Sequence, residues 1–253
     1  MRQLAHADPD AVAGNPLARR VLKGVSRAVF GVLTSTEVCG LEHAPPRGPL
    51  IVAMNHVAEI DPAVSTAFLP WPIESLALVD LLSVPGTATL LRLYGVIPVD
   101  RDAHNGSAIV LALDALRQDK IVGILPEGRV SLTGGLERAR TGVAYLALTS
   151  GAPVLPCAIT GTEVALARLK RLRRPRLTLT VGQPLQFELE NVTGPNRHAR
   201  LRDVADQIMY RIAALLPARY RGVYGMVPPV GPPPRHSVDS LAGVDVSRGA
   251  AEA

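Results

Sequence analysis

Aromatic side chains are scarce in this sequence of 253 residues, because Phe, Trp and Tyr together make up 4% of it. Hydrophobic residues still amount to 47%, so the core must be built mainly from Leu, Val, Ala and Ile. Single-stranded nucleic acid is bound by stacking its bases on aromatic rings, and the chain has no helix-turn-helix, zinc-finger or RRM signature. Nucleic acid is therefore not an expected partner.

Cysteine is nearly absent too, since Cys39 and Cys157 are the only two in the sequence. They cannot make a disulfide framework, and no CxxC spacing offers a zinc site. We expect a reducing compartment and no bound metal.

The chain also lacks a long uninterrupted apolar run. Its longest uncharged stretch, residues 141–162, contains Gly151, Pro153 and Pro156, which favours a helix, a turn and a strand over a membrane span. Residues 1–16 have no apolar segment of the kind that secretory signals carry. We expect neither a signal peptide nor a transmembrane helix.

Lysine is rare, since it supplies three of the 27 basic residues, and the net charge is +5. Arginine presents a planar fork that suits phosphate and carboxylate groups, so anionic partners are plausible. The densest basic stretch, residues 168–176, is most simply a solvated face. It could also attract anionic headgroups or a cofactor phosphate.

Apolar runs and helical segments alternate along the chain, which predicts a single α/β domain with a mostly parallel central sheet flanked by helices. The expected strands are 38–41, 50–54, 76–79, 95–99, 121–125, 154–159 and 177–181, and the expected helices are 16–33, 62–68, 87–94, 107–118, 138–149 and 201–215. We divide the chain into a flexible arm (1–15), an amphipathic helix (16–36), the α/β domain (37–225) and a Pro/Gly-rich disordered tail (226–253).

The N-terminal helix has an apolar stripe and a basic side. The stripe holds Leu17, Val21, Leu22, Val25, Val29 and Leu33, and the basic residues Arg19, Arg20, Lys23 and Arg27 lie largely off it. A basic amphipathic helix can lie in a bilayer interface, but an ordinary surface helix packs such a stripe on its own domain. Taken alone, the segment favours packing on the domain.

His56 stands where open α/β sheets bind their ligands, directly after an apolar strand that ends in Asn55. Asp61 follows five residues later, before Pro62. The aspartate suits a helix cap, or its carboxylate can accept the proton on one imidazole nitrogen. In the second case the other nitrogen can take a proton from an alcohol. No serine nucleophile is implied, because GxSxG is absent.

Two further strand ends carry an acid beside an arginine. Residues 95–101 end in Asp100 and Arg101, and residues 125–131 contain Glu127, Gly128 and Arg129. A glycine beside an arginine lets the backbone approach a phosphate closely. Each pair can be a plain structural ion pair, but together at strand ends they predict an anion site beside a base.

These segments, in this order, resemble the four sequence blocks of the glycerolipid acyltransferase family, of which the lysophosphatidic acid acyltransferases are typical. The blocks are Asn55-His56-x-x-x-x-Asp61, Gly95 to Arg101, Pro126-Glu127-Gly128-Arg129, and Val154-Leu155-Pro156. The resemblance runs from about residue 41 to residue 181. The third block commonly reads Glu-Gly-Thr-Arg-Ser, so Arg129 stands one place early.

The resemblance implies that His56 is the general base and that Asp61 orients it. It implies that Arg101, Glu127, Gly128 and Arg129 bind a glycerol-phosphate headgroup. Further motif or structural residues would be Asn55, Gly95, Asp100, Pro126, Ser131, Gly142 and Pro156, the last in a block associated with the acyl donor or with packing.

The resemblance also implies an O-acyltransferase that needs no tightly bound cofactor. Such an enzyme moves a fatty acyl group from acyl-CoA or acyl carrier protein to 1-acylglycerol-3-phosphate and gives phosphatidic acid for phospholipid biosynthesis. Both lipids partition into the bilayer, so we expect a peripheral protein on the cytoplasmic face of the membrane, with residues 16–33 in contact with it. Another lysolipid or glycolipid acceptor stays open. So does a non-catalytic acyl-CoA- or lipid-binding protein, against which the intact His56 and Asp61 argue.

Overall fold

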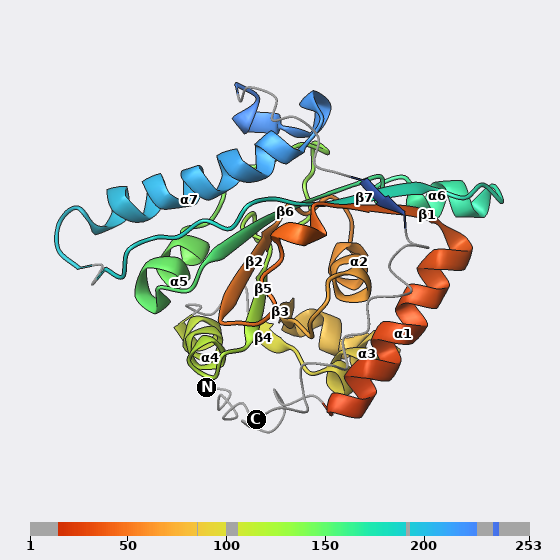
Figure 1. Ribbon diagram of the computed structural model, residues 1–253, viewed down its shortest axis with the longest axis horizontal. Helices are drawn as coiled ribbons and strands as arrows, with labels where there is room; N and C mark the ends of the chain where they lie inside the picture. The colour runs from red at the N-terminus through yellow and green to blue at the C-terminus, as the bar shows by residue number, and fades with distance from the viewer. Residues whose placement is uncertain (1–14, 85, 100–105, 191–192, 227–234, 238–253) are drawn as a thin grey trace.

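An eight-stranded sheet runs through the centre of the molecule, with helices on both of its faces (Figure 1). The computed structural model describes residues 15–84, 86–99, 106–190, 193–226 and 235–237. In chain order the strands are β1 (Ser35–Cys39), β2 (Leu50–Met54), β3 (Glu74–Leu78), β4 (Ile97–Val99), β5 (Ile121–Ile124), β6 (Val154–Thr160), β7 (Arg176–Val181) and β8 (Arg235–Ser237). The helices are α1 (Pro16–Leu33), α2 (Asp61–Phe68), α3 (Thr87–Tyr94), α4 (Gly106–Arg117), α5 (Gly142–Ser150), α6 (Ala165–Lys170) and α7 (Arg197–Leu215), with short 3-10 turns η2 (Leu41–His43), η3 (Val79–Ser83), η4 (Ala218–Tyr220) and η5 (Gly222–Tyr224).

The strand order is β4-β3-β5-β2-β6-β7-β1-β8. The five strands from β4 to β6 are parallel, whereas β7 runs antiparallel to β6 and parallel to β1. The carboxyl ends of β2, β3, β5 and β6 therefore meet at one edge of the sheet. This edge is where a parallel α/β sheet presents its functional loops.

The core explains the near-continuous apolar runs of the sequence. Every residue of β2 is buried, and so are the first six of β6, because α4, α5 and α7 cover one face of the sheet and α2, α1 and α3 cover the other (Figure 1). Strands covered on both faces have this composition. The predicted α/β class, with a mostly parallel sheet and a preceding helix, is confirmed.

One predicted helix begins later than its sequence suggests. The pattern favoured a helix over 138–149, but α5 starts at Gly142. The backbone N–H of Arg140 donates to the carbonyl of Pro126 at 2.7 Å, which holds this segment outside the helix. The sequence analysis also missed α6, which lies in part within the basic stretch 168–176.

The ends of the chain are described only in part. Of the predicted arm, Asn15 is described, and its side chain accepts the backbone N–H of Leu17 at 2.9 Å and so caps α1. Of the predicted tail, Met226 and the strand β8 are described, and β8 pairs antiparallel with β1.

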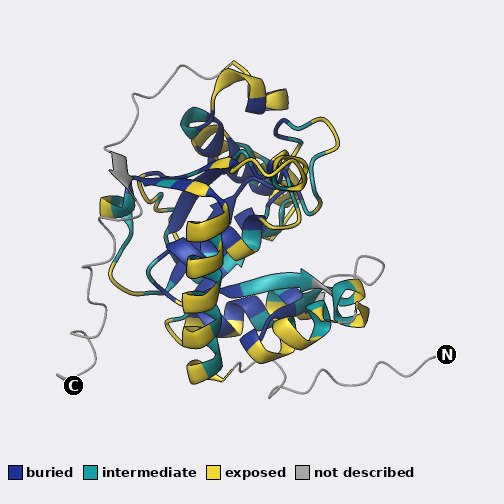
Figure 2. Cartoon of the chain, turned by 90° about the vertical axis from the view of Figure 1, so that its right-hand side faces the viewer, coloured by how far each residue is buried: buried dark blue, intermediate teal, exposed yellow. Residues whose placement is uncertain are grey.

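Helix α1 docks with its polar side toward the domain. The Arg19 guanidinium forms two 2.7 Å hydrogen bonds with the buried Glu74 carboxylate, and the Lys23 ammonium donates to the carbonyls of Leu69 and Pro70. Figure 2 shows the outer side of the helix as exposed.

The exposed side of α1 is the apolar stripe. Leu17, Val21, Val25 and Val29 are 69%, 55%, 54% and 47% exposed, respectively. The interpretation that this stripe packs on the domain is therefore wrong. None of the helices in the described ranges is at once long and apolar enough to cross a bilayer.

Candidate active site

His56 and Asp61 meet at the carboxyl end of β2, as their spacing predicted. The loop between β2 and α2 folds back so that Nδ1 of His56 lies 3.0 Å from Oδ2 of Asp61. The same oxygen accepts the backbone N–H groups of Val57 at 2.7 Å and Ala58 at 2.8 Å. Asp61 is fully buried at the first turn of α2. Its bonded oxygen is turned back to residues that precede α2, so Asp61 orients the histidine and does not cap the helix.

The contact with Asp61 determines which nitrogen of the His56 imidazole carries the proton. A carboxylate accepts hydrogen bonds, so Nδ1 of His56 carries the proton and donates it to Asp61. Nε2 is then left with a free electron pair, and it has no hydrogen-bond partner among the described residues. A neutral imidazole in this tautomer can take a proton from a hydroxyl group.

Asn55 fastens the histidine loop to the neighbouring strand. Its side-chain amide donates to the carbonyl of Ile159 at 2.9 Å, and its carbonyl oxygen accepts the N–H of Ile159 at 2.7 Å. This pair of bonds continues the contact of β2 with β6 one residue beyond the ladder. Asn55 therefore positions the backbone immediately before His56.

Glu127 lies beneath the site and joins two loops. Its carboxylate accepts the backbone N–H of His56 at 3.0 Å and that of Glu137 at 2.7 Å. Burial raises the pKa of Glu127 to about 7, although both N–H donors oppose the shift. Ser131 adds a second link, because its N–H donates to the carbonyl of His56 at 2.8 Å. Glu127 is thus placed to position the histidine loop, and its buried carboxylate is occupied by backbone groups.

Arg129 is exposed, but its charge is already paired. Its Nε and Nη2 atoms donate to one oxygen of Glu137 at 2.9 and 2.6 Å. The other oxygen of Glu137 accepts the N–H of Leu132 at 2.8 Å. The Leu132 N–H and the Arg129 guanidinium together lower the pKa of Glu137. A ligand phosphate would have to compete with this carboxylate for Arg129.

Arg140 is the basic residue that the sequence analysis missed. Gly128 has a left-handed φ of +72°, and a Cβ at this position would lie 2.7 Å from Nε of Arg140. The arginine side chain therefore lies across the glycine. It is exposed and forms no ion pair within the described part of the chain. The Arg140-Thr141 sequence before α5 gives no sign of this contact, which depends on residues twelve positions apart.

The remaining predicted residues are distributed as follows. Asp100 and Arg101 lie outside the described residues. Gly95 follows α3 with a φ of +78°, and Gly142 is the first residue of α5. Pro156 lies within β6 beside Ala53, and its carbonyl accepts the N–H of Gly182 at 2.8 Å. The first and third blocks thus meet, and β6, the strand that contains the fourth block, is joined to Asn55 at Ile159.

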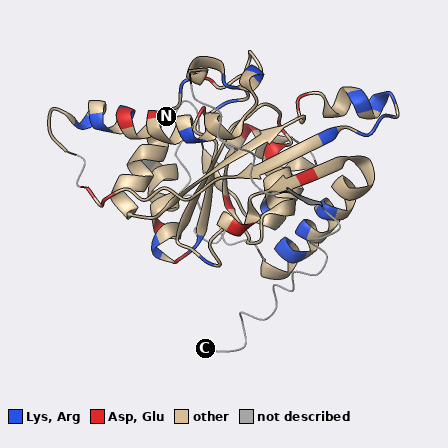
Figure 3. Cartoon of the chain, turned by 45° about the horizontal axis from the view of Figure 1, so that its top comes forward, with Lys and Arg blue, Asp and Glu red and all other residues tan. Residues whose placement is uncertain are grey.

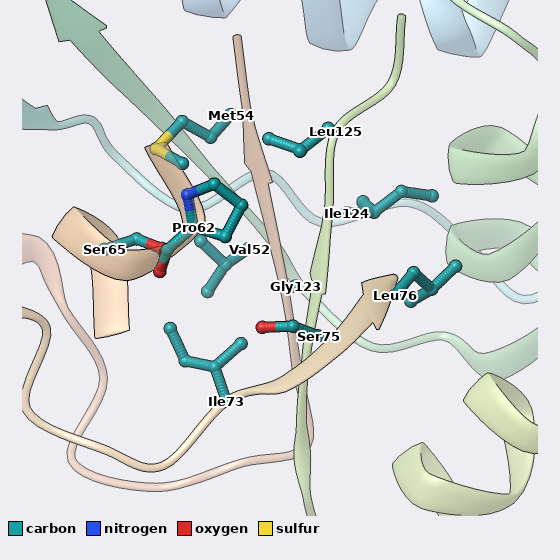
Figure 4. Close-up of a pocket in the computed structure, with 10 residues that line it drawn as sticks. All are labelled: Val52, Met54, Pro62, Ser65, Ile73, Ser75, Leu76, Gly123, Ile124 and Leu125. Carbon is teal, nitrogen blue, oxygen red and sulfur yellow. The ribbon is translucent and has the colours of Figure 1, made fainter. Parts of the chain in front are cut away.

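A small, mostly apolar cleft lies between α2 and the strands β2, β3 and β5 (Figure 4). It is lined by residues of β2, α2, β3 and β5 and their adjoining segments, namely Val52, Met54, Pro62, Ser65, Ile73, Ser75, Leu76, Gly123, Ile124 and Leu125. Met54 precedes His56 by two residues, and Pro62 directly follows Asp61. The cleft therefore reaches residues on both sides of the histidine loop, although neither His56 nor Asp61 lines it.

Gly123 shapes one wall of this cleft. A Cβ at this position would lie 2.6 Å from Cγ2 of Ile73, closer than real side chains approach. Glycine therefore lets β5 and the start of β3 pack closely where the cleft is lined.

The cysteine in the neighbouring strand is not a competing nucleophile. Complete burial raises the pKa of the Cys157 thiol to about 12, and the thiolate is the reactive form of cysteine. Within the described ranges, no three His, Cys, Asp or Glu side chains gather as a metal-binding group would.

Comparisons with known proteins find acyltransferases. The acyltransferase family model matches residues 35–160, about half of the chain. The chain is similar to the 1-acyl-sn-glycerol-3-phosphate acyltransferase of Borreliella burgdorferi, with 31% identity over 128 residues, 50% of this chain and 51% of that protein. For the Bacillus subtilis protein of the same name, identity is 24% over 184 residues, 72% of this chain and 89% of that protein.

The human 1-acyl-sn-glycerol-3-phosphate acyltransferase alpha is 30% identical over 123 residues, 47% of this chain and 44% of that protein. The match thus spans about half the length of the Borreliella and human relatives. Among solved structures, the chain is similar to the 1-acyl-sn-glycerophosphate (LPA) acyltransferase PlsC of Thermotoga maritima. The TM-score is 0.55 with 21% identity, over 75% of this chain and 78% of that chain. This likeness establishes the fold.

Proposed function

Because the chain belongs to the acyltransferase family, we propose that it transfers a fatty acyl group from a thioester donor to the free hydroxyl of 1-acylglycerol-3-phosphate. The single observation that carries this proposal is the buried His56–Asp61 pair, with Nε2 of the histidine left free at the end of β2. The names of the relatives support the choice of acceptor. The product is phosphatidic acid.

His56 acts as the general base. Its Nε2 takes the proton of the acceptor hydroxyl while the oxygen attacks the carbonyl carbon of the thioester. The tetrahedral intermediate then collapses and the C–S bond breaks, and the leaving sulfur receives the proton from the His56 imidazolium, which releases a thiol and regenerates the neutral base. Asp61 keeps Nδ1 protonated and stabilises the transient imidazolium. General-base assistance of this kind typically accelerates a reaction by roughly 10²- to 10⁴-fold.

The apolar cleft marks where the first carbons of the fatty acyl chain would lie, and its volume of about 20 Å³ means that it must widen to take more of the chain. All ten of its lining residues lie in strands or helices or directly adjoin them, and Met54 and Pro62 lie on either side of the histidine loop in the sequence. Burying methylene groups there contributes about 0.8 kcal/mol for each CH₂. The donor is acyl-CoA or acyl carrier protein, both of which present the same thioester to His56.

Arg140 binds the phosphate of the acceptor, assisted by Arg129. Arg140 lies on Gly128 next to the loop that Glu127 joins to His56, and no described acid neutralises it. Arg101 of the second block is a further candidate for this role. Holding the phosphate fixes the hydroxyl near the base, and such positioning is worth roughly 7–11 kcal/mol in the most favourable cases.

The protein works at the membrane surface, where both lipid substrates reside. The exposed apolar stripe of α1 supports this location, because the helix directs its charged side to the domain and its valines outward. Such a face is suited to lie in the interfacial plane of a bilayer.

The test is acyl transfer by the purified protein. Lysophosphatidic acid is supplied in mixed micelles with acyl-CoA or acyl carrier protein, and the release of thiol and the formation of phosphatidic acid are followed together. His56→Ala is expected to abolish turnover while the protein stays folded. His43→Ala is the matched control, because this half-buried histidine contacts the carbonyl of Val181 away from the site.

Wild-type protein that is inactive with both donors would contradict the proposal. Near-normal turnover by His56→Ala would leave the reaction class intact but contradict the mechanism.

A further inference from the structure

A basic arm, residues 164–176, projects from the sheet beside β7 (Figure 1). Its six cationic residues are Arg168, Lys170, Arg171, Arg173, Arg174 and Arg176, and no acidic residue occurs between Glu163 and Glu188. All six are exposed, and none forms an ion pair with another residue in the described part of the chain. Figure 3 shows these basic residues gathered at one end of the molecule.

A leucine is held outward among these cations. Leu172 is 97% exposed and has a left-handed φ of +54°, a conformation that is unfavourable for a bulky side chain. Its N–H donates to the carbonyl of Leu169 at 2.9 Å, and the N–H of Arg173 donates to that of Arg168 at 3.0 Å. The turn is therefore ordered by hydrogen bonds, and it presents Leu172 to the surroundings at the tip of the arm.

The base of the arm is attached to the end of α1. Nη2 of Arg174 donates to the carbonyls of Gly31 at 2.7 Å and Thr34 at 2.6 Å, and the N–H of Ser35 donates to the carbonyl of Pro175 at 2.8 Å. A cation is favoured at a helix C-terminus. The exposed stripe of α1 reaches this end of the helix at Leu33. The basic arm and the apolar stripe are therefore neighbouring parts of one surface.

We propose that the basic arm binds the anionic headgroups of a phospholipid bilayer, with Leu172 entering the interface. The inference rests on the proposed function in one respect, which is that the membrane holds the substrates. Charge complementarity supports an anionic ligand, because six cations lie within nine residues and none has an acidic partner among the residues that the structure describes. The exposed Leu172 favours a lipid surface over the phosphates of CoA, since only a bilayer offers an apolar layer behind its negative charges.

The test measures binding to vesicles, not turnover. The protein is sedimented with vesicles of phosphatidylcholine alone or mixed with phosphatidylglycerol. Wild type is expected to bind the anionic vesicles about tenfold more tightly or better, since each basic residue near such a surface adds to the attraction. This preference should shrink at high salt, which screens the charges.

Matched double variants locate the effect. Arg171→Gln with Arg173→Gln removes the two cations that flank Leu172, whereas Arg117→Gln with Arg211→Gln removes two exposed cations from α4 and α7. The first variant is expected to lose most of the preference for anionic vesicles and the second to keep it. Leu172→Ser should also weaken binding, with the salt dependence retained.

Three outcomes would overturn the inference. One is wild type without preference for anionic vesicles, and another is equal losses in the two double variants. The third is a raised KM for acyl-CoA in the Arg171/Arg173 variant with unchanged vesicle binding, which would assign the arm to the donor. Because His56→Ala should still bind the vesicles, a failure of binding is distinguishable from a failure of the proposed reaction.

Discussion

A single carboxylate oxygen organises the whole histidine loop. Oδ2 of Asp61 accepts hydrogen bonds from the imidazole of His56 and from the backbone of Val57 and Ala58. The two backbone donors keep the carboxylate in place even when the imidazole moves. The orientation of the base is therefore built into the loop before any substrate arrives, which is the condition for efficient proton transfer.

Glu127 should make stability depend on pH. Burial raises its pKa to about 7, so between about pH 4.5 and pH 7 the folded protein binds a proton that the unfolded chain has released. The stabilisation is therefore fully present at low pH and is lost as pH rises toward 7. Relative to Glu127→Gln, wild type is expected to lose roughly 2 kcal/mol of unfolding free energy between pH 5 and pH 8.

Urea unfolding of both proteins at the two pH values measures this difference. In Glu127→Gln the side-chain amide faces a backbone N–H, which changes the unfolding free energy by an amount that does not depend on pH. The change with pH in the difference between the two proteins is therefore the informative quantity. A difference between the two proteins that does not vary with pH would contradict the prediction.

Arg140 and Arg129 should differ in their effect on the acceptor. Arg140 is unpaired among the described residues, whereas Arg129 is already bonded to Glu137. A hydrogen bond to a charged group is worth about 1.5–3 kcal/mol. We therefore expect Arg140→Ala to raise the KM for lysophosphatidic acid roughly tenfold or more, and Arg129→Ala to raise it less.

Steady-state kinetics with lysophosphatidic acid and with monoacylglycerol test this prediction. The KM for the phosphate-free acceptor and that for the donor should stay unchanged in Arg140→Ala. If Arg129→Ala has the larger effect, Arg129 exchanges Glu137 for the substrate and is the principal phosphate ligand.

At the scale of elements, an ion pair between Arg19 of α1 and Glu74 of β3 attaches the helix to the domain. The side chains of Arg19 and Glu74 are 11% and 4% exposed, and removing one partner of such a buried pair typically costs about 3–5 kcal/mol. Arg19→Met leaves the Glu74 carboxylate buried without its cation. We expect this variant to lose roughly 3 kcal/mol of stability, and Arg19→Met with Glu74→Gln to lose clearly less.

Chemical denaturation of Arg19→Met, of Glu74→Gln and of the double variant measures the coupling free energy between the two side chains. If the losses simply add, the pair contributes nothing beyond its separate side chains, and α1 must be held by its other contacts.

The sequence allowed most elements to be predicted, because their determinants are local. The runs 50–54, 16–33 and 87–94 became β2, α1 and α3 with the predicted bounds. The histidine pair was also predictable, since five residues suffice to fold Asp61 back to His56. The position of Arg140 was not, because it depends on a bond to Pro126 from another loop.

The orientation of α1 was likewise beyond sequence reasoning. Periodicity locates an apolar stripe on a helix but does not say which side meets the domain. The side that meets the domain is set by Glu74, which binds Arg19, and by the carbonyls after α2 that accept hydrogen bonds from Lys23. Both partners are distant in the sequence from α1.

At the scale of the whole molecule, one side gathers the features that suit a membrane. The apolar stripe of α1 lies beside α3, where Leu90 and Leu93 are also exposed, and the basic arm adjoins the end of α1. Deleting α1 would test this side poorly, because the deletion would also leave Glu74 buried without Arg19. Substitutions on the exposed stripe avoid this complication.

The sharpest test of this side replaces Val21 and Val25 by serine. Both are about half exposed (55% and 54%), so serine should change stability by less than about 1 kcal/mol. Binding to phosphatidylcholine vesicles should nevertheless fall roughly tenfold, because two apolar groups no longer enter the bilayer. The matched control is Val110→Ser with Val223→Ser, whose valines are 60% and 68% exposed but lie on α4 and η5. If both double variants bind like wild type, α1 is not the membrane contact, and the bilayer would have to be reached through the basic arm alone.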